Sequence, residues 1–539
     1  MRTNQLNISI KFLLFCIFLN SCKNDIKKYT TAYESPKSVL PVSLDRTQTP
    51  IPAFGIPGTL VSIKVKGLLP YKDVTIFKFN GQTATIKEIT DSVLVAEVPN
   101  NATTGIISIS INDVVLFGPN FKVDGKINID NTFKIKNGTN GSVNSLLKTA
   151  DGKIIYFGSF TNFDNKAVLD PINKLARTYS DGTYDATFRT GKGANGYLSR
   201  GIQINNKLYI AGNFSAYDQR TQDISNLTQL NLNGRIDTIG VHTFRRPDQT
   251  DTIKYYPTFN GGVDGNLESI YFHQNKILIA GSFTNYIYRE YDKPNKLETK
   301  DSVIIHKIPM NQIALLNLDG SLDKTFRFDQ SASKGYSSAN GPISIYYHTD
   351  ELLKGKILVY GSFTKFDGQP EGYILRLNPD GTKDKTFNPG GSGADYNISY
   401  ASYNPLTKKY MICGNFKNYN GKNSPMLAML NQDGTLDQSF IPKIFDGGQP
   451  RFVYQLSDGK ILVSGIFAKY NYISRSNLLF LTNTGELAEG YNAYGDVSGI
   501  ISNLYETTSD DGKKALLILG NIRSFNGENV NNLFRITLE

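Results

Sequence analysis

One short pattern recurs seven times in this sequence, and the recurrence constrains the fold more than any other feature. The first copy reads DGKIIYFGSFTNF and occupies residues 151–163. Later copies keep a turn, alternating apolar residues, a glycine, and two large apolar or aromatic residues three positions apart. The copies are marked by Gly158, Gly212, Gly281, Gly361, Gly414, Gly465 and Gly520, at spacings of 54, 69, 80, 53, 51 and 55 residues. A strand-patterned repeat of about fifty residues predicts an array of similar small β-sheets.

Each repeat continues with a second apolar strand, a tight turn and, in most copies, the pattern D-x-T-F. The turns contain Asp-Gly or Asn-Gly, which suit the positive φ angles of two-residue hairpins. The D-x-T-F copies are Asp185–Phe188, Asp323–Phe326, Asp384–Phe387 and Asp437–Phe440. We therefore expect about four strands per repeat. We interpret the aspartate as an acceptor of hydrogen bonds within its turn and the repeated aromatic residues as packing between neighbouring sheets.

The two ends of the repeat array differ from its middle. The last repeat stops at NNLFRITLE, before any D-x-T-F pattern, and an orphan copy, Asp130–Phe133, precedes the first repeat. A ring whose last sheet takes its outer strand from the N-terminal side explains both facts, whereas an open array would leave sheet edges exposed. We predict a seven-bladed β-propeller over residues 126–539, closed by an N-terminal strand. The stretched units at 238–262 and 285–311 leave six or eight blades open. The motifs resemble the delta-60-type propeller repeat.

A separate β domain is predicted before the ring, at residues 45–125. Several segments alternate between apolar and polar residues, and Asn80-Gly81 between two of them is a strong hairpin signal. The turn residues Gly58, Gly67, Pro99 and Gly105 fall where the IPT/TIG family, an immunoglobulin-like sandwich, places its turns. The stretch resembles that family, which implies a spacer or docking role. The whole chain is thus expected to be all-β.

The N-terminus carries a targeting signal. Arg2 and Lys11 precede the apolar stretch Phe12–Leu19, which is too short to span a bilayer and suits a signal peptide over residues 1–21. The following Leu19-Asn20-Ser21-Cys22 resembles a bacterial lipobox, which implies lipidation at Cys22 and anchoring in the outer membrane. An ordinary secretory signal followed by a chance cysteine is the alternative. Residues 22–44 are polar and contain proline, so we expect a flexible tether.

The sequence lacks the motifs of several classes of protein. None of the four histidines has the spacing of metal ligands, and no phosphate-binding or nucleophile motif occurs. We therefore expect no enzyme activity, no cofactor and no metal site, although a carboxylate pair assembled across blades stays open. The net charge of +10 is spread along the chain, which argues against binding to nucleic acid.

Two insertions and one scattered set of tyrosines are the candidates for ligand binding. Loops that stand off a rigid ring often carry binding residues, and Tyr and Arg are enriched at binding hot spots. The candidates in the insertions 240–262 and 287–309 are Arg245, Arg246, Tyr255, Tyr256, Tyr288, Arg289 and Tyr291. The insertions could equally be loop filler or stabilising hairpins. The third candidate surface contains Tyr336, Tyr346, Tyr347, Tyr396, Tyr400 and Tyr403.

The combination of lipobox, tether, IPT/TIG-like module and propeller resembles accessory surface lipoproteins of the Bacteroidota. That resemblance implies an outer-membrane, lipid-anchored protein, expected at the cell surface, that captures a glycan or peptide without catalysis. It also implies a TonB-dependent transporter and a SusD-like lipoprotein as partners. A scaffold that holds an outer-membrane complex together through propeller contacts is the alternative, and a hydrolase or lyase is a third. Whether the protein faces the periplasm or the medium stays open.

Overall fold

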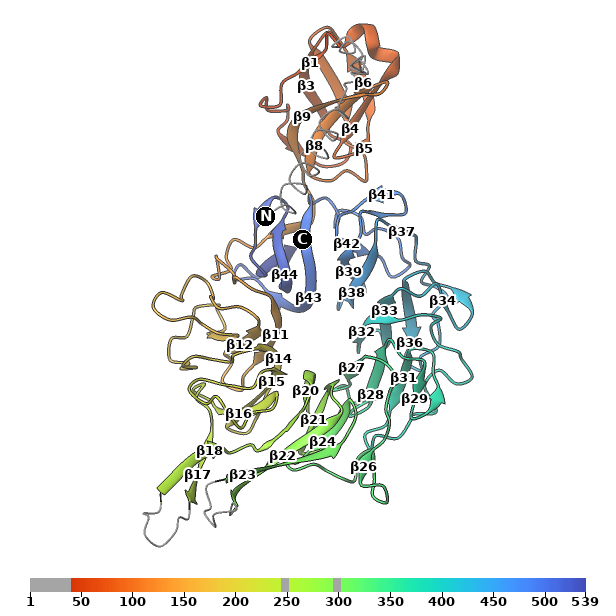
Figure 1. The fold of residues 1–539 in the computed structure, drawn as a ribbon. Coiled ribbons are helices and arrows are strands. Elements are labelled where there is room, and N and C mark those ends of the chain that lie inside the picture. Colours follow the sequence, from red (N-terminus) through yellow and green to blue (C-terminus); the bar gives the residue numbers. More distant parts are fainter. Residues whose placement is uncertain (1–39, 244–251, 294–301) are drawn as a thin grey trace, which may run out of the picture.

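The computed structural model describes residues 40–243, 252–293 and 302–539. It is an all-β structure, with a small two-sheet body joined to a larger ring of sheets (Figure 1). The signal peptide and Cys22 lie outside the described residues, and so do Arg245 and Arg246. Within the described ranges, no helix has the length and apolar character needed to cross a membrane.

The small body consists of two sheets that enclose one hydrophobic core. One sheet has the order β1 (Ser43–Leu44), β3 (Leu60–Lys66), β7 (Val93–Glu97) and β6 (Thr85–Ile89). The other has the order β2 (Phe54–Gly55), β9 (Val114–Val123), β8 (Gly105–Ile111), β4 (Thr75–Phe79) and β5 (Gln82–Thr83). Phe77, Phe79 and Phe121 are buried between the sheets. The turn between β4 and β5 is Asn80-Gly81, with positive φ angles of 41° and 82°, so the predicted hairpin is confirmed.

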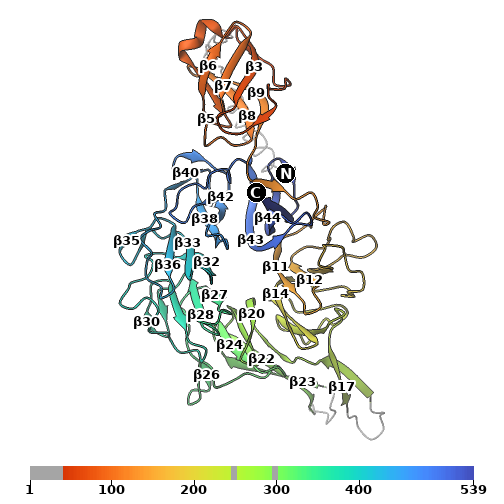
Figure 2. The ribbon, with the colours of Figure 1, turned by 180° about the vertical axis from the view of Figure 1, so that it is seen from behind.

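In the described residues, seven antiparallel sheets follow one another around the ring (Figures 1 and 2). Their first strands face the centre. The sheets are β11 (Val143–Lys148), β12 (Ile154–Gly158) and β13 (Leu175–Thr178); β14 (Tyr197–Ile204), β15 (Lys207–Asn213) and β16 (Leu227–Asn231); β20 (Asn266–His273), β21 (Lys276–Ser282) and β24 (Ile313–Leu316); β27 (Ile343–Tyr347), β28 (Ile357–Gly361) and β31 (Ile374–Leu377); β32 (Ile398–Asn404), β33 (Lys409–Gly414) and β36 (Leu427–Asn431); β38 (Gln449–Gln455), β39 (Ile461–Ile466) and β42 (Leu478–Leu481); and β43 (Val497–Thr508), β44 (Lys514–Phe525), β46 (Leu533–Leu538) and β10 (Ile127–Ile129).

The repeats contain fewer full strands than the sequence predicts. In the first six sheets the expected fourth strand is reduced to a single bridge, such as the one between Thr178 and Tyr184. In four of these sheets, the first, third, fourth and fifth, the reason is the aspartate that follows the bridge. The carboxylate of Asp185 accepts hydrogen bonds from the backbone N–H of Thr187 at 2.9 Å and from its hydroxyl at 2.6 Å, which turns the chain away from the sheet. The predicted role of this aspartate is confirmed.

The glycine that marks each repeat is required by a close approach between two strands. Gly281 lies opposite Leu267 in the neighbouring strand. A Cβ atom at Gly281 would stand 2.1 Å from the carbonyl oxygen of Asn266. At the other six marker glycines, the corresponding distance from a Cβ to a carbonyl oxygen of the innermost strand is 2.0 to 2.3 Å. Each marker glycine therefore lets the first strand of its sheet pack against the second.

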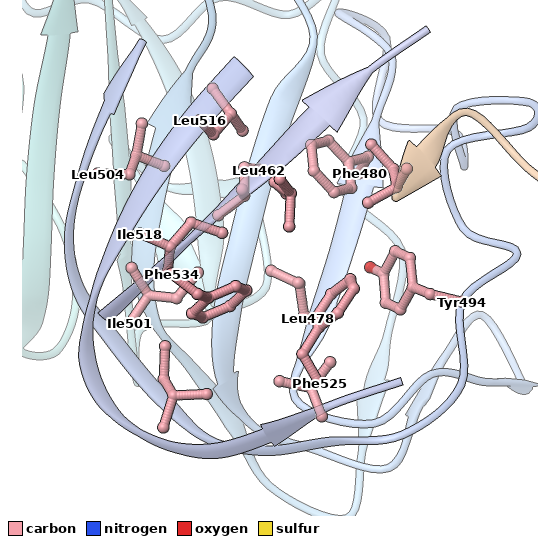
Figure 3. Close-up of a cluster of buried hydrophobic side chains, with 14 of the residues drawn as sticks. Leu462, Leu478, Phe480, Tyr494, Ile501, Leu504, Leu516, Ile518, Phe525 and Phe534 are labelled. Carbon is pink, nitrogen blue, oxygen red and sulfur yellow. The ribbon is translucent and has the colours of Figure 1, made fainter. Parts of the chain in front are cut away.

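Seven hydrophobic clusters fill the spaces between neighbouring sheets of the described ring. Each contains the paired apolar residues that follow a marker glycine, together with strands of the preceding sheet. Figure 3 shows the cluster between the last two sheets, where Phe525 and Ile518 face Leu462 and Leu478. In the cluster between the first and last sheets, Phe160 and Phe163 pack with Leu517 and Leu519. The aromatic residues thus pack between sheets as predicted.

The ring is closed by the strand that precedes the first repeat. β10 pairs in antiparallel orientation with β46, with Ile127 opposite Leu538. The buried carboxylate of Asp130 accepts a hydrogen bond from Nε of Arg535 in β46. This pairing confirms the prediction that a strand from the N-terminal side forms the outer strand of the last sheet.

The two stretched repeats contain additional strands. β17 (Thr238–Thr243) pairs with β18 (Thr252–Pro257), and β22 (Asn285–Lys293) pairs with β23 (Ser302–Pro309) and β19 (Gly261–Val263). These hairpins project side by side from the rim of the ring (Figures 1 and 2). The insertions are therefore extra hairpins and not irregular loops in their described parts.

The D-x-T-F aspartates should make the ring sensitive to acid. Burial alone would raise the pKa of Asp185, but hydrogen bonds from Thr187 and Lys153 and the charge of Arg177 outweigh it and lower the pKa to about 2. The unfolded pKa is about 3.9, so the stabilisation is complete above that pH and is lost as the pH falls toward 2. We expect Asp185→Asn to lower the free energy of unfolding by about 2 kcal/mol at pH 7. In urea titrations the difference should shrink at pH 2.5, and a difference independent of pH would contradict this account.

Candidate functional site

A cavity of about 690 Å³ lies at the centre of the ring. Its walls are formed mainly by the innermost strands β11, β14, β20, β27, β32, β38 and β43, which Figure 1 shows around the centre. Tyrosine and serine dominate the lining. The tyrosines are Tyr271, Tyr346, Tyr347, Tyr360, Tyr400, Tyr454 and Tyr505. This is the principal candidate for a binding site in the described chain.

Irregularities in the innermost strands direct side chains into the cavity. The pairing of β14 with β15 shifts between Leu198 and Arg200, so that Ser199 is an extra residue in the first strand. Such a bulge changes the direction of the side chains next to it. The corresponding extra residues in five other sheets are Asn144, Glu268, Ser399, Arg451 and Ser502. All of these residues except Arg451 line the cavity.

Several of the lining serines hold neighbouring sheets together. The hydroxyl of Ser145 donates to the carbonyl of Ser199 at 2.7 Å, and the hydroxyl of Ser199 donates to the carbonyl of Leu267 at 2.7 Å. On another side of the ring, the hydroxyl of Ser402 donates to the carbonyl of Val453 at 2.9 Å. These bonds connect the first strand of one sheet to the first strand of the next. They fix the shape of the cavity and leave recognition to other residues.

Arg200, Glu268 and Glu506 are the charged residues that line the cavity, and Glu506 is hydrogen-bonded to Ser457. The guanidinium of Arg200 lies 4.7 Å from the ring centre of Tyr271, within the range of a cation–π contact. Burial acts to lower the pKa of Arg200, but interactions with Tyr271 and Tyr505 outweigh it and raise the pKa. Glu268 is partly accessible to solvent, yet desolvation by the surrounding cavity raises the pKa of its carboxyl group. Neither Arg200 nor Glu268 forms an ion pair with a residue of the described ranges.

A second ordered feature near these residues is a stacked pair of tyrosines. The rings of Tyr271 and Tyr347 are 5.0 Å apart at an angle of 24°. The hydroxyl of Tyr347 lies 3.1 Å from Nδ1 of His273, whose Nε2 lies 2.8 Å from the carbonyl oxygen of Pro379. This contact chain holds the Tyr347 ring in place. The cavity therefore combines fixed aromatic surfaces with one cation, Arg200, and two acids, Glu268 and Glu506.

The third surface predicted from the sequence divides into three parts in the structure. Tyr346, Tyr347 and Tyr400 line the cavity. Tyr336 and Tyr396 are exposed and do not line it, and Tyr403 is buried. Arg200 and Glu268 were not among the residues predicted from the sequence. The signal available for them was their position, one or two residues after the apolar residue that faces a marker glycine.

The residues proposed in the two insertions lie on the hairpins, away from the cavity. Tyr255 is exposed. Tyr256 is buried and stacks on Tyr291 with ring centres 4.3 Å apart, and Arg289 is also buried. Tyr288 is half-buried beside His306. A binding role for this set stays a prediction, with Tyr255 the most accessible of the described members.

The described residues contain no group of three or more His, Cys, Asp or Glu side chains that could hold a metal ion.

Residues 355–387, 408–440 and 456–487 match the family described as "Domain of unknown function (DUF5122) beta-propeller". The ring is accordingly a β-propeller. No curated protein matches the chain.

Solved structures give only distant similarities. The WD40 β-propeller domain of Doa1 is 11% identical over 76% of this chain and 96% of its own, with a TM-score of 0.36. An auxiliary nutrient binding protein from Bacteroides ovatus is 9% identical over 92% of this chain and 99% of its own, with a TM-score of 0.29. A protein of unknown function from Bacteroides thetaiotaomicron is 12% identical over 92% and 99%, with a TM-score of 0.23. Similarities this low do not bear on what the present chain binds.

Proposed function

We propose that this protein is a non-catalytic lipoprotein that captures a glycan or peptide in the central cavity for an outer-membrane uptake system. In this proposal the ring is a seven-bladed propeller and the N-terminal body is an immunoglobulin-like IPT/TIG module that acts as a spacer. Cys22 carries the lipid that holds the protein in the outer membrane at the cell surface. A TonB-dependent transporter and a SusD-like lipoprotein are the proposed partners.

The lining of the central cavity carries this proposal. Tyrosine rings present flat apolar surfaces with a polar edge, which suit sugar rings and peptide side chains. Arg200 supplies a fixed cation for carbonyl or carboxylate groups, since guanidinium recognises planar oxygen acceptors well. A cavity of about 690 Å³ has the size of an ordinary small-molecule site. Three of the lining serines are hydrogen-bonded between sheets, which supports a cavity of fixed shape.

The exposed apolar residues of the rim hairpins favour the scaffold as a second candidate function. Ile239, Ile253 and Tyr255 are exposed on β17 and β18, and Ile304 and Ile305 are exposed on β23. Exposed apolar surface at a projecting element is typical of protein–protein contacts. In this alternative the hairpins hold a partner, and the cavity has no part in the function.

Substitutions in the two regions distinguish these functions. We expect Arg200→Gln and Tyr400→Ala to weaken binding to a panel of soluble oligosaccharides and short peptides by about tenfold, because each removes a contact in the cavity. Tyr255→Ala on the hairpin should leave that affinity unchanged. The measurements are calorimetric titration of the purified protein and recovery of partner proteins by pull-down. Loss of partner recovery in Tyr255→Ala, with no ligand bound by the wild type, would favour the scaffold instead.

A further inference from the structure

The junction between the N-terminal body and the ring contains a buried arginine without a matching acid. The two parts are joined by a backbone hydrogen bond from Thr104 N–H to the Ala493 carbonyl at 2.8 Å, and Ala493 packs in the hydrophobic core of the N-terminal body. Arg475 lies at this junction and is only 5% exposed. Its guanidinium donates to the carbonyl oxygens of Ser474 at 2.6 Å and of Asn101 at 3.2 and 3.3 Å.

The charge of Arg475 is not balanced by these contacts. In the described ranges, no carboxylate lies within ion-pair distance of it. Burial lowers the pKa of Arg475 to about 10, so the side chain is still charged at neutral pH. Buried charges in proteins are normally paired, because removing an ion from water costs several kcal/mol. Something other than the described side chains must therefore balance this charge.

A cavity of about 230 Å³ adjoins Arg475 at the junction. This is several times the roughly 30 Å³ that one water molecule occupies in the liquid. Asn80 and Thr103 of the N-terminal body line it, together with Lys469, Tyr494 and Asp496 of the ring. Lys469 is already paired with Asp446 at 3.8 Å, and Arg475 and Asp496 are the other charged residues of the lining.

Two residues of this lining each carry a donor atom without a hydrogen-bond partner. Nε of Arg475 and the hydroxyl of Tyr494 are both buried and have no hydrogen-bond partner among the described residues. The Tyr494 ring is held at the edge of the hydrophobic cluster by Phe525, 5.1 Å away between ring centres (Figure 3). Burial raises the pKa of Tyr494, and the nearby charge of Arg475 opposes this only in part, so the hydroxyl stays protonated and can donate.

We propose that this cavity is a binding site for a small oxyanion, such as phosphate, sulfate or a carboxylate group, held by Arg475 and Tyr494. An oxyanion accepts hydrogen bonds from both of these donors and supplies the missing negative charge. Because Asn80 and Thr103 come from the N-terminal body, the bound anion would connect that body to the ring. The site is separate from the central cavity, so it does not depend on the function proposed for that cavity.

The test is the thermal stability and calorimetry of the full chain in detergent, titrated with sodium phosphate, sulfate or acetate at constant ionic strength. We expect at least one of these anions to raise Tm in a saturable way. Arg475→Gln should weaken the apparent affinity by about tenfold or more, since hydrogen bonds to charged groups are the stronger ones. Tyr494→Phe should weaken it several-fold, because it removes one donor and keeps the ring.

Arg451→Gln is the matched control, because Arg451 is exposed and does not line the cavity. It should bind the anion as the wild type does. Should Arg475→Gln fail to fold, Tyr494→Phe still reports on the site through the isosteric loss of its hydroxyl. The proposal is overturned if none of the three anions gives a saturable effect, or if Tyr494→Phe and Arg475→Gln respond as Arg451→Gln does.

Discussion

In Gly281→Ala, the free energy of unfolding is expected to fall by about 3 kcal/mol, the upper end of the usual cost of overpacking, because the clash is with backbone atoms. The new methyl group would stand 2.1 Å from the carbonyl oxygen of Asn266 and 2.9 Å from the Cα of Leu267. Both are backbone atoms of β20, so no side chain can turn aside to make room. β20 and β21 would have to separate next to Glu268, where β20 begins to line the cavity. Urea denaturation followed by circular dichroism measures the loss.

Gly240→Ala is the control for this substitution. Gly240 lies in β17, and a Cβ there would first meet side-chain atoms of Ile253 and Tyr255, at 3.1 and 3.3 Å. Those side chains are exposed, so they can shift. We expect a change within about 1 kcal/mol. Similar losses in the two variants would show that the close approach at the marker glycine is not what the repeat requires.

Asp130→Asn is expected to lower the free energy of unfolding by about 3 kcal/mol, the usual cost of removing one partner from a buried ion pair. The side chains of Asp130 and Arg535 are 2% and 7% exposed. The Asp130 carboxylate also accepts hydrogen bonds from the backbone and hydroxyl of Thr132. Since β10 and β46 are the two strands that close the ring, the loss weakens the closure itself. Equilibrium unfolding in urea gives the value.

An exposed ion pair next to the end of β46 is the control for this substitution. Glu539 contacts Lys513 at 2.7 Å, but both side chains are nearly half exposed. Glu539→Gln should change stability by less than about 1 kcal/mol, as is usual for surface pairs. If Asp130→Asn were no more harmful than Glu539→Gln, the Asp130–Arg535 contact would not be important for closure.

The repeating part of the fold could be predicted because each repeat satisfies the same physical requirements. The marker glycines, the paired aromatic residues and the D-x-T-F turns each have a contact that recurs from sheet to sheet, so their spacing reveals the sheets. The orphan copy at Asp130–Phe133 likewise revealed the strand β10. The length of the outer strand was overestimated, because in four sheets Asp185 or an equivalent aspartate ends it after one bridge.

The candidate site was harder to predict because it depends on what differs between repeats. Arg200 and Glu268 each occur in one sheet, and a strand bulge brings them into the cavity. A bulge shifts the alternation of apolar and polar residues by one position, and in a strand of eight residues such a shift is hard to distinguish from ordinary variation. The charge imbalance at Arg475 was equally hidden, since it arises where the N-terminal body meets a strand turn hundreds of residues later in the chain.

The closure of the ring also determines the order in which the protein can mature. Asp130 and Arg535 are 405 residues apart in sequence, so the first strand of the ring must wait for the end of the chain before it is paired. Until then Phe160 and Phe163 lack Leu517 and Leu519, and one apolar face of the first sheet is open to solvent. Contacts of such long range form slowly and leave intermediates prone to association. A chain exported in an unfolded form would therefore depend on holding chaperones until its last strand has emerged.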